Sequence, residues 1–110
     1  MSTISTHVLD TALGKPAVGV HIALRRTHDG ATLGTGVTDA DGRVSKVDFP
    51  VIEPGTYRLH FDTAAYFAQS ARETFYPEIT VVFRVGDGGG SHFHVPLLLS
   101  PFGYSTYRGS

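Results

Sequence analysis

The stretch that decides the fold is His92-Phe93-His94-Val95-Pro96-Leu97-Leu98-Leu99-Ser100, close to the end of a 110-residue chain. If it is a β-strand, its side chains alternate between two faces. One face is wholly apolar and suits a protein core: Phe93, Val95, Leu97 and Leu99. The opposite face carries two imidazoles and then becomes apolar: His92, His94, Pro96 and Leu98. Because proline cannot donate to a sheet ladder, we expect an edge position or a bulge there, and another protein surface covering this second face.

The rest of the chain predicts further short strands separated by turns. The clearest period-two alternation lies in residues 18–25, and turn signals such as Asp41-Gly42 recur about every ten residues. The expected strands cover residues 4–9, 18–25, 31–38, 43–47, 57–62, 79–85 and 92–99. An Ala-rich segment at 63–72, with Asp62 or Thr63 as its N-cap, predicts one short helix, while 10–16 and 86–90 are expected to be loops. The pattern is typical of an all-β fold, a β-sandwich of seven to eight strands with one short helix.

Length and composition narrow the classes of protein. We expect residues 1–110 to form a single domain with one core. The net charge of −1 provides no field for steering nucleic acid or an anionic membrane. The absence of cysteine excludes a disulfide framework and a thiolate zinc site. Residues 1–7 lack the pattern of a signal peptide, and no apolar run approaches the length of a membrane span, so we expect a cytoplasmic location.

Six histidines are the main candidates for chemistry, and they divide into two groups. His21, His28 and His60 fall in a turn or alternate with core positions, so a structural role is expected. His92 and His94 share one strand face, where they could act as a general acid–base pair. They could equally be two ligands of a metal site, which would need a third ligand such as His7.

Arg43 follows the tight turn at residues 39–42. That turn resembles the start of a calcium loop, but an arginine occupies a ligand position and no glutamate closes the loop. The guanidinium could instead point its fixed donors at an anionic or carbonyl-rich ligand, or simply be hydrated. The sequence has no nucleophile elbow and no cysteine, so no covalent nucleophile is expected. The glycine run at 86–90 lacks the Lys-Ser/Thr of a phosphate-binding loop.

Three separated stretches resemble the 5-hydroxyisourate hydrolases, a transthyretin-related enzyme family. They are Ser5-Thr6-His7-Val8-Leu9-Asp10 with Gly14-Lys15-Pro16-Ala17, Thr38-Asp39-Ala40-Asp41-Gly42-Arg43, and residues 92–101 with the terminal Tyr107-Arg108-Gly109-Ser110. The resemblance runs over the whole chain. The terminal motif distinguishes the hydrolases from transthyretin, the hormone carrier of the same fold. The one departure is Phe93, where many members carry tyrosine.

This resemblance implies a transthyretin-like β-sandwich that assembles as a homotetramer, a dimer of dimers with active sites at the dimer–dimer interface. The implied reaction is hydrolytic opening of 5-hydroxyisourate to 2-oxo-4-hydroxy-4-carboxy-5-ureidoimidazoline (OHCU) in urate breakdown. It requires no cofactor and no metal. The competing hypotheses are a transthyretin-like carrier of an aromatic ligand, which needs an apolar channel, and a zinc site at the histidines.

The resemblance also implies residue roles. His7 and His94 flank the substrate with His92 beside them, and His7 is the favoured base for activating water, although the sequence does not rank the three. Arg43 holds the substrate and stabilises charge on oxygen. The remaining roles belong to the C-terminal motif, in which Tyr107 and the terminal carboxylate of Ser110 orient substrate or water while Arg108 and Gly109 shape the end of the site.

Overall fold

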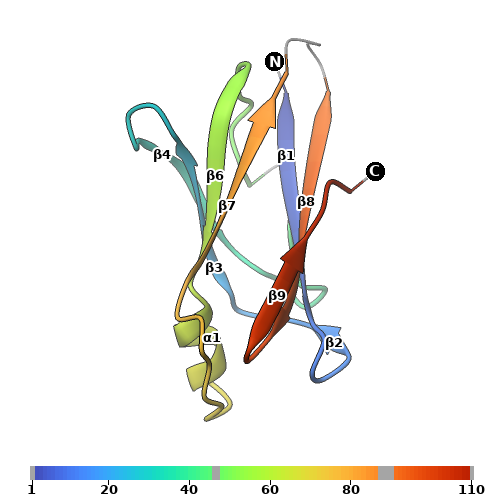
Figure 1. The fold of residues 1–110 in the computed structure, drawn as a ribbon. Coiled ribbons are helices and arrows are strands. Elements are labelled where there is room, and N and C mark those ends of the chain that lie inside the picture. Colours follow the sequence, from blue (N-terminus) through green and yellow to red (C-terminus); the bar gives the residue numbers. More distant parts are fainter. Residues whose placement is uncertain (1, 46–47, 87–90, 110) are drawn as a thin grey trace.

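Two β-sheets packed face to face form the body of the molecule in the computed structural model, which describes residues 2–45, 48–86 and 91–109 (Figure 1). The first sheet runs β2 (Lys15–Pro16), β1 (Thr3–Asp10), β8 (His92–Ser100) and β9 (Gly103–Thr106), with β5 (Arg43–Val44) also paired to β1. The second sheet runs β4 (Thr32–Val37), β3 (His21–Arg26), β6 (Gly55–Phe61) and β7 (Ile79–Val85). The expected all-β sandwich with one short helix, α1 (Thr63–Ala68), is confirmed.

The core lies between the sheets and is built from alternate residues of the strands. The predicted apolar face of β8 is confirmed, because Val95, Leu97 and Leu99 are buried and Phe93 packs partly buried against them. β1 alternates in the same way, with Ile4 and Val8 fully buried. Burying each such side chain contributes about 1.5–3 kcal/mol. The alternation therefore leaves the other face of β1 and β8 pointing away from the core.

β8 is an interior strand, so the expected edge position or bulge at Pro96 is wrong. β8 lies between β1, its parallel partner, and β9, its antiparallel partner. The pairing with β9 reaches only as far as Leu97 opposite Thr106, and the Pro96 carbonyl accepts a hydrogen bond from Thr106 Oγ1 at 2.7 Å. That carbonyl faces the β9 side, and so does the proline nitrogen. The missing N–H therefore falls just beyond the end of the β9 ladder, where no partner is lost.

Several boundaries differ from those expected. β3 begins only at His21, because Gly19 takes a positive φ of 83°. α1 is capped by Asp62, whose carboxylate accepts from the Ala65 N–H at 3.2 Å, but it ends at Ala68 rather than residue 72. β5 is two residues long, and the loop expected at 10–16 contains β2, while β9 was not predicted. Residues 46–47 and 87–90 lie outside the described residues. No helix in the described ranges is long and apolar enough to cross a membrane.

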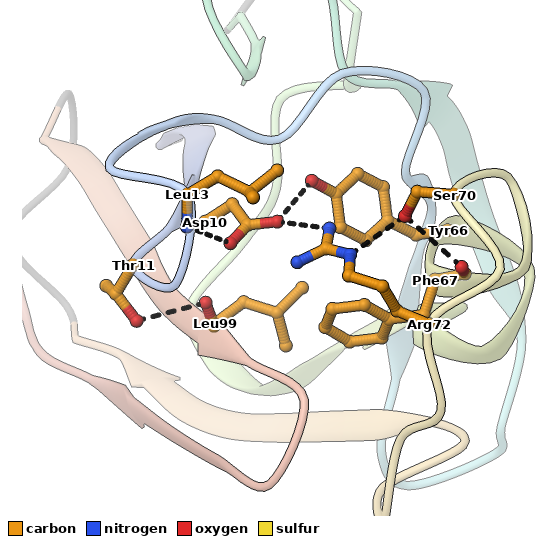
Figure 2. Close-up of polar contacts among 8 residues, drawn as sticks. All are labelled: Asp10, Thr11, Leu13, Tyr66, Phe67, Ser70, Arg72 and Leu99. Carbon is orange, nitrogen blue, oxygen red and sulfur yellow. Dashed lines mark hydrogen bonds and ion pairs between the residues drawn. The ribbon is translucent and has the colours of Figure 1, made fainter.

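A buried charge cluster joins the end of β1 to α1 and the segment after it (Figure 2). The fully buried carboxylate of Asp10 accepts hydrogen bonds from Arg72 Nη2 and Tyr66 Oη, each at 2.6 Å, and from the Leu13 N–H at 3.0 Å. Burial opposes ionisation of Asp10, but these three donors outweigh it and hold its pKa below the usual value. Burial, followed by the bond to Asp10, raises the pKa of Tyr66 to about 12. The cluster thus fixes the end of the strand that carries Ser5 and His7.

Candidate active site

The outer face of the first sheet brings together four of the eight predicted site residues, His7, Arg43, His92 and His94, because β1 pairs with both β5 and β8. The register sets Thr3 opposite His92 and Ser5 opposite His94. Arg43 on β5 lies opposite His7 from the other side of β1. Strands lie about 4.8 Å apart and rise about 3.3 Å per residue, so the backbone positions of His7 and His94 are roughly 8 Å apart. Residues from both ends of the chain therefore share one face.

A cleft of about 470 Å³ opens on this face. Its lining brings together three of the predicted site residues, Arg43, His92 and His94, with four neighbours from β1, β5 and the residue after it: Ser5, Thr6, Val44 and Ser45. His7 lies on β1 directly opposite Arg43 on β5, but it does not line the cleft itself. The lining includes a guanidinium, two imidazoles and three hydroxyl side chains, and the basic groups suit a ligand rich in carbonyl oxygens or carrying negative charge.

Four side chains in this region form one continuous hydrogen-bonded chain. Thr3 Oγ1 lies 2.6 Å from His92 Nδ1, and Ser5 Oγ lies 2.8 Å from both His92 Nε2 and His94 Nδ1. Both ring nitrogens of His92 are thus engaged, whereas the hydrogen bonds among the described residues leave Nε2 of His94 available. The sequence reasoning did not identify Ser5 or Thr3, because only the strand register places them beside the imidazoles.

The environment of His94 favours the neutral imidazole. Burial lowers its pKa below the ordinary value, and the positive charge of Arg43, together with that of His7 or His92 when either is protonated, lowers it further. A neutral imidazole at neutral pH can accept a proton, so His94 has the state that a general base requires.

Arg43 is placed by the turn that precedes it. The Asp39 carboxylate accepts from the N–H groups of Asp41 at 2.9 Å and Arg43 at 3.0 Å, and these bonds hold its pKa below the usual value. Gly42 takes a positive φ of 75°, and a Cβ there would lie 2.4 Å from the Val8 carbonyl oxygen. The turn can therefore dock against β1 only with glycine at this position, and this docking starts β5 at Arg43.

The C-terminal segment folds back onto β8. The Gly109 N–H donates to the His94 carbonyl at 2.8 Å, and a Cβ on Gly109 would lie 2.5 Å from His94 Cδ2. The Arg108 guanidinium lies 4.7 Å from the centroid of the Phe93 ring. Tyr107 and Arg108 line a second hollow, which His94 also borders. The predicted role of Ser110 falls on a residue outside the described part of the chain.

The other histidines lie elsewhere. His21 and His60 are on the second sheet, where His60 Nε2 lies 3.2 Å from Glu78, and His28 is in an exposed turn. Within residues 2–45, 48–86 and 91–109, no group of three His, Asp or Glu side chains could hold a metal ion.

Comparisons with known proteins identify relatives that are similar to this chain over nearly its whole length. A profile of the HIUase/transthyretin family covers residues 4–109. A 5-hydroxyisourate hydrolase of Salmonella dublin is 48% identical over 111 residues, covering 97% of this chain and 80% of that protein. The structure of Klebsiella pneumoniae 5-hydroxyisourate hydrolase is 42% identical with a TM-score of 0.88, covering 100% of this chain and 94% of that one. Sea bream transthyretin, solved in complex with thyroxine, is 35% identical with a TM-score of 0.82, covering 97% of this chain and 94% of that one.

Proposed function

The chain belongs to the HIUase/transthyretin family, and we propose that within this family it is the enzyme that hydrolyses 5-hydroxyisourate to OHCU. The observation that carries the proposal is the convergence of Arg43, His92 and His94 on one cleft, in a chain nearly half identical to a 5-hydroxyisourate hydrolase. A carrier of an aromatic ligand needs an apolar lining. This cleft is basic, so the carrier hypothesis is not favoured.

The reaction begins with a water molecule held beside His94. As water attacks the ring carbonyl carbon, its proton moves to His94 Nε2, and the carbonyl oxygen becomes an oxyanion. The Arg43 guanidinium stabilises that charge. The ring C–N bond then breaks, and the leaving nitrogen takes the proton back from His94. The sequence favoured His7 as the base, but we assign this step to His94 because His94 lines the cleft and has the lowered pKa. In this proposal His7, which lies opposite Arg43 at the border of the cleft, contacts the part of the substrate nearest Arg43.

The rate enhancements expected of the acid–base group and of the oxyanion donor are large enough for this mechanism without a covalent intermediate. A positioned acid–base group contributes about 10²–10⁴-fold. One oxyanion donor contributes about 10²–10³-fold. The C-terminal motif completes the site in this proposal, with Gly109 packed on His94 and Tyr107 and Ser110 orienting the substrate or water.

We also propose that the protein acts as a homotetramer, with each cleft covered by a neighbouring subunit. The outer face of β8 supports this, because it carries an exposed imidazole and a half-buried leucine rather than a fully polar surface. Light scattering coupled to size exclusion measures the mass, and an active monomer at assay concentrations would contradict the proposal.

Site variants test the mechanism. His94→Ala and Arg43→Ala should each lower turnover at least about a hundredfold while the circular dichroism spectrum is retained. His21→Ala, on the second sheet, is the matched control and should retain full activity. Ultraviolet absorbance of freshly generated 5-hydroxyisourate gives the rates. Wild-type turnover by either site variant would remove that residue from the mechanism.

A further inference from the structure

The hydrogen-bonded chain on the outer face of β1 and β8 gives Ser5 a place that the mechanism above does not yet use. Its hydroxyl lies between two imidazoles, 2.8 Å from His92 Nε2 and 2.8 Å from His94 Nδ1. We propose that Ser5 is a positioning residue for the hydrolysis, setting the tautomer of His94 and relaying its positive charge to His92. This inference rests on the proposed function.

Three proton arrangements place one proton in each bond of the chain when both imidazoles are neutral, because a hydroxyl oxygen can accept twice. In one of them Ser5 accepts from both imidazoles, which leaves His94 Nε2 unprotonated but provides no relay; the other two run in a single direction along the chain. In the first of these two, His94 Nδ1–H donates to Ser5, the Ser5 hydroxyl donates to His92 Nε2, and His92 Nδ1–H donates to Thr3. In the second, every bond is reversed. The first arrangement leaves His94 Nε2 with a lone pair, which is the state that a base needs. The second leaves Nε2 protonated.

The relay moves protons without net loss or gain. Starting from the first arrangement, His94 Nε2 takes the proton of the attacking water. The Nδ1 proton of His94 then passes to Ser5 Oγ as the Ser5 proton passes to His92 Nε2. His94 is again neutral, now protonated at Nε2, and His92 carries the charge. When His94 donates its Nε2 proton to the leaving nitrogen, the reverse shift through Ser5 restores the starting state.

The environments of the two imidazoles favour this direction of transfer. His94 is half-buried, whereas His92 is exposed and its Nδ1–H has Thr3 Oγ1 as an acceptor at 2.6 Å. The groups whose positive charge disfavours a charged His94 lie on β5 and β1 as well as on its own strand: Arg43, and His7 or His92 whenever either imidazole is protonated. Water stabilises charge on an exposed imidazole more than on a buried one. The charge that forms on His94 is therefore better held on His92.

Imidazole ¹⁵N signals of the intact, substrate-free protein test the tautomer directly. In the wild-type protein at neutral pH, His94 should carry its proton on Nδ1. In Ser5→Ala the hydroxyl partner of Nδ1 is gone and only a backbone contact with Ser5 remains, so the proton should shift to Nε2. Ser5→Thr keeps a hydroxyl and should keep the wild-type pattern. Ser70→Ala removes a hydroxyl near α1, far from the imidazoles, and is the matched control. Unchanged His94 signals in Ser5→Ala, or an Nε2 proton in the wild type, would overturn the proposal.

Turnover provides the second measurement. Ser5→Ala should lower kcat about tenfold, less than the full value of an acid–base group because His94 is still present, and Ser5→Thr should restore most of it. Equal loss in both variants would indicate a packing role and overturn the relay. A wild-type protein that fails to hydrolyse 5-hydroxyisourate would instead refute the proposed function, and the ¹⁵N signals would still decide whether Ser5 sets the tautomer.

Discussion

Replacing Arg72 with methionine should destabilise the fold without touching the cleft. The variant removes the guanidinium that lies 2.6 Å from the Asp10 carboxylate and leaves this carboxylate buried (Figure 2). Methionine retains part of the packing against the ring of Phe67, over which the guanidinium lies 4.9 Å from the centroid. The change therefore isolates the loss of charge and hydrogen bonding.

The expected cost follows from burial. Removing one partner of a buried ion pair costs about 3–5 kcal/mol, because an uncompensated charge remains. The Asp10 side chain is 0% exposed and that of Arg72 is 22% exposed, so we expect the lower end of that range. For a domain of this size, about 3 kcal/mol lowers the melting temperature by about 12 °C. Turnover per folded molecule should not change.

The Arg26–Asp29 pair offers a matched control. It has the same 2.6 Å separation, but both side chains are 38% exposed, so solvent screens the attraction. Arg26→Met should therefore leave the melting temperature nearly unchanged. Thermal melts followed by circular dichroism at one fixed protein concentration compare the two variants, since assembly makes melting concentration-dependent. Equal shifts for the two variants would refute the reasoning that burial, and not distance, sets the value of these pairs.

Three further predictions concern Gly109, Tyr66 and Asp10. Gly109→Ala places a Cβ 2.5 Å from His94 Cδ2 and should lower kcat/KM by about tenfold to a hundredfold by displacing the imidazole ring. Gly103→Ala is the control, because the nearest contact of its added Cβ is 3.7 Å away. Equal activity of the two variants would contradict this prediction. Because the pKa of Tyr66 is raised to about 12 from 10, its contribution to stability is complete below pH 10 and is lost as the pH rises from 10 to about 12. Tyr66→Phe should remove that part of the alkaline loss in denaturant unfolding, and an unaltered loss would disprove the assignment. The pH dependence of stability that comes from Asp10 has the opposite sign. Because the pKa of Asp10 is lowered in the folded protein, its contribution to stability is lost as the pH falls below the ordinary pKa of an aspartate.

Local patterns in the sequence predict much of the fold. Alternation identifies which residues of β1 and β8 are buried, the Asp41-Gly42 pair marks the turn before Arg43, and Asp62 caps α1 as expected. Each of these features depends on neighbours within a few residues. Local patterns do not distinguish functional histidines from structural ones, so the site residues were predicted from the resemblance to the 5-hydroxyisourate hydrolases.

Pairing across long sequence distances is what the sequence reasoning missed. A period-two pattern specifies the face of a strand but not its partner, so the parallel register that sets Ser5 opposite His94 was not predictable. The same holds for the ion pair of Asp10 with Arg72. Pro96 suggested an edge strand, whereas the early end of β9 lets it sit inside the sheet.

The most direct test of the central claim is the decay rate of freshly generated 5-hydroxyisourate with and without the protein, followed by ultraviolet absorbance. We predict that the protein accelerates loss of 5-hydroxyisourate in proportion to its concentration, with OHCU as the product. Decay at the uncatalysed rate in the presence of folded protein would contradict the account.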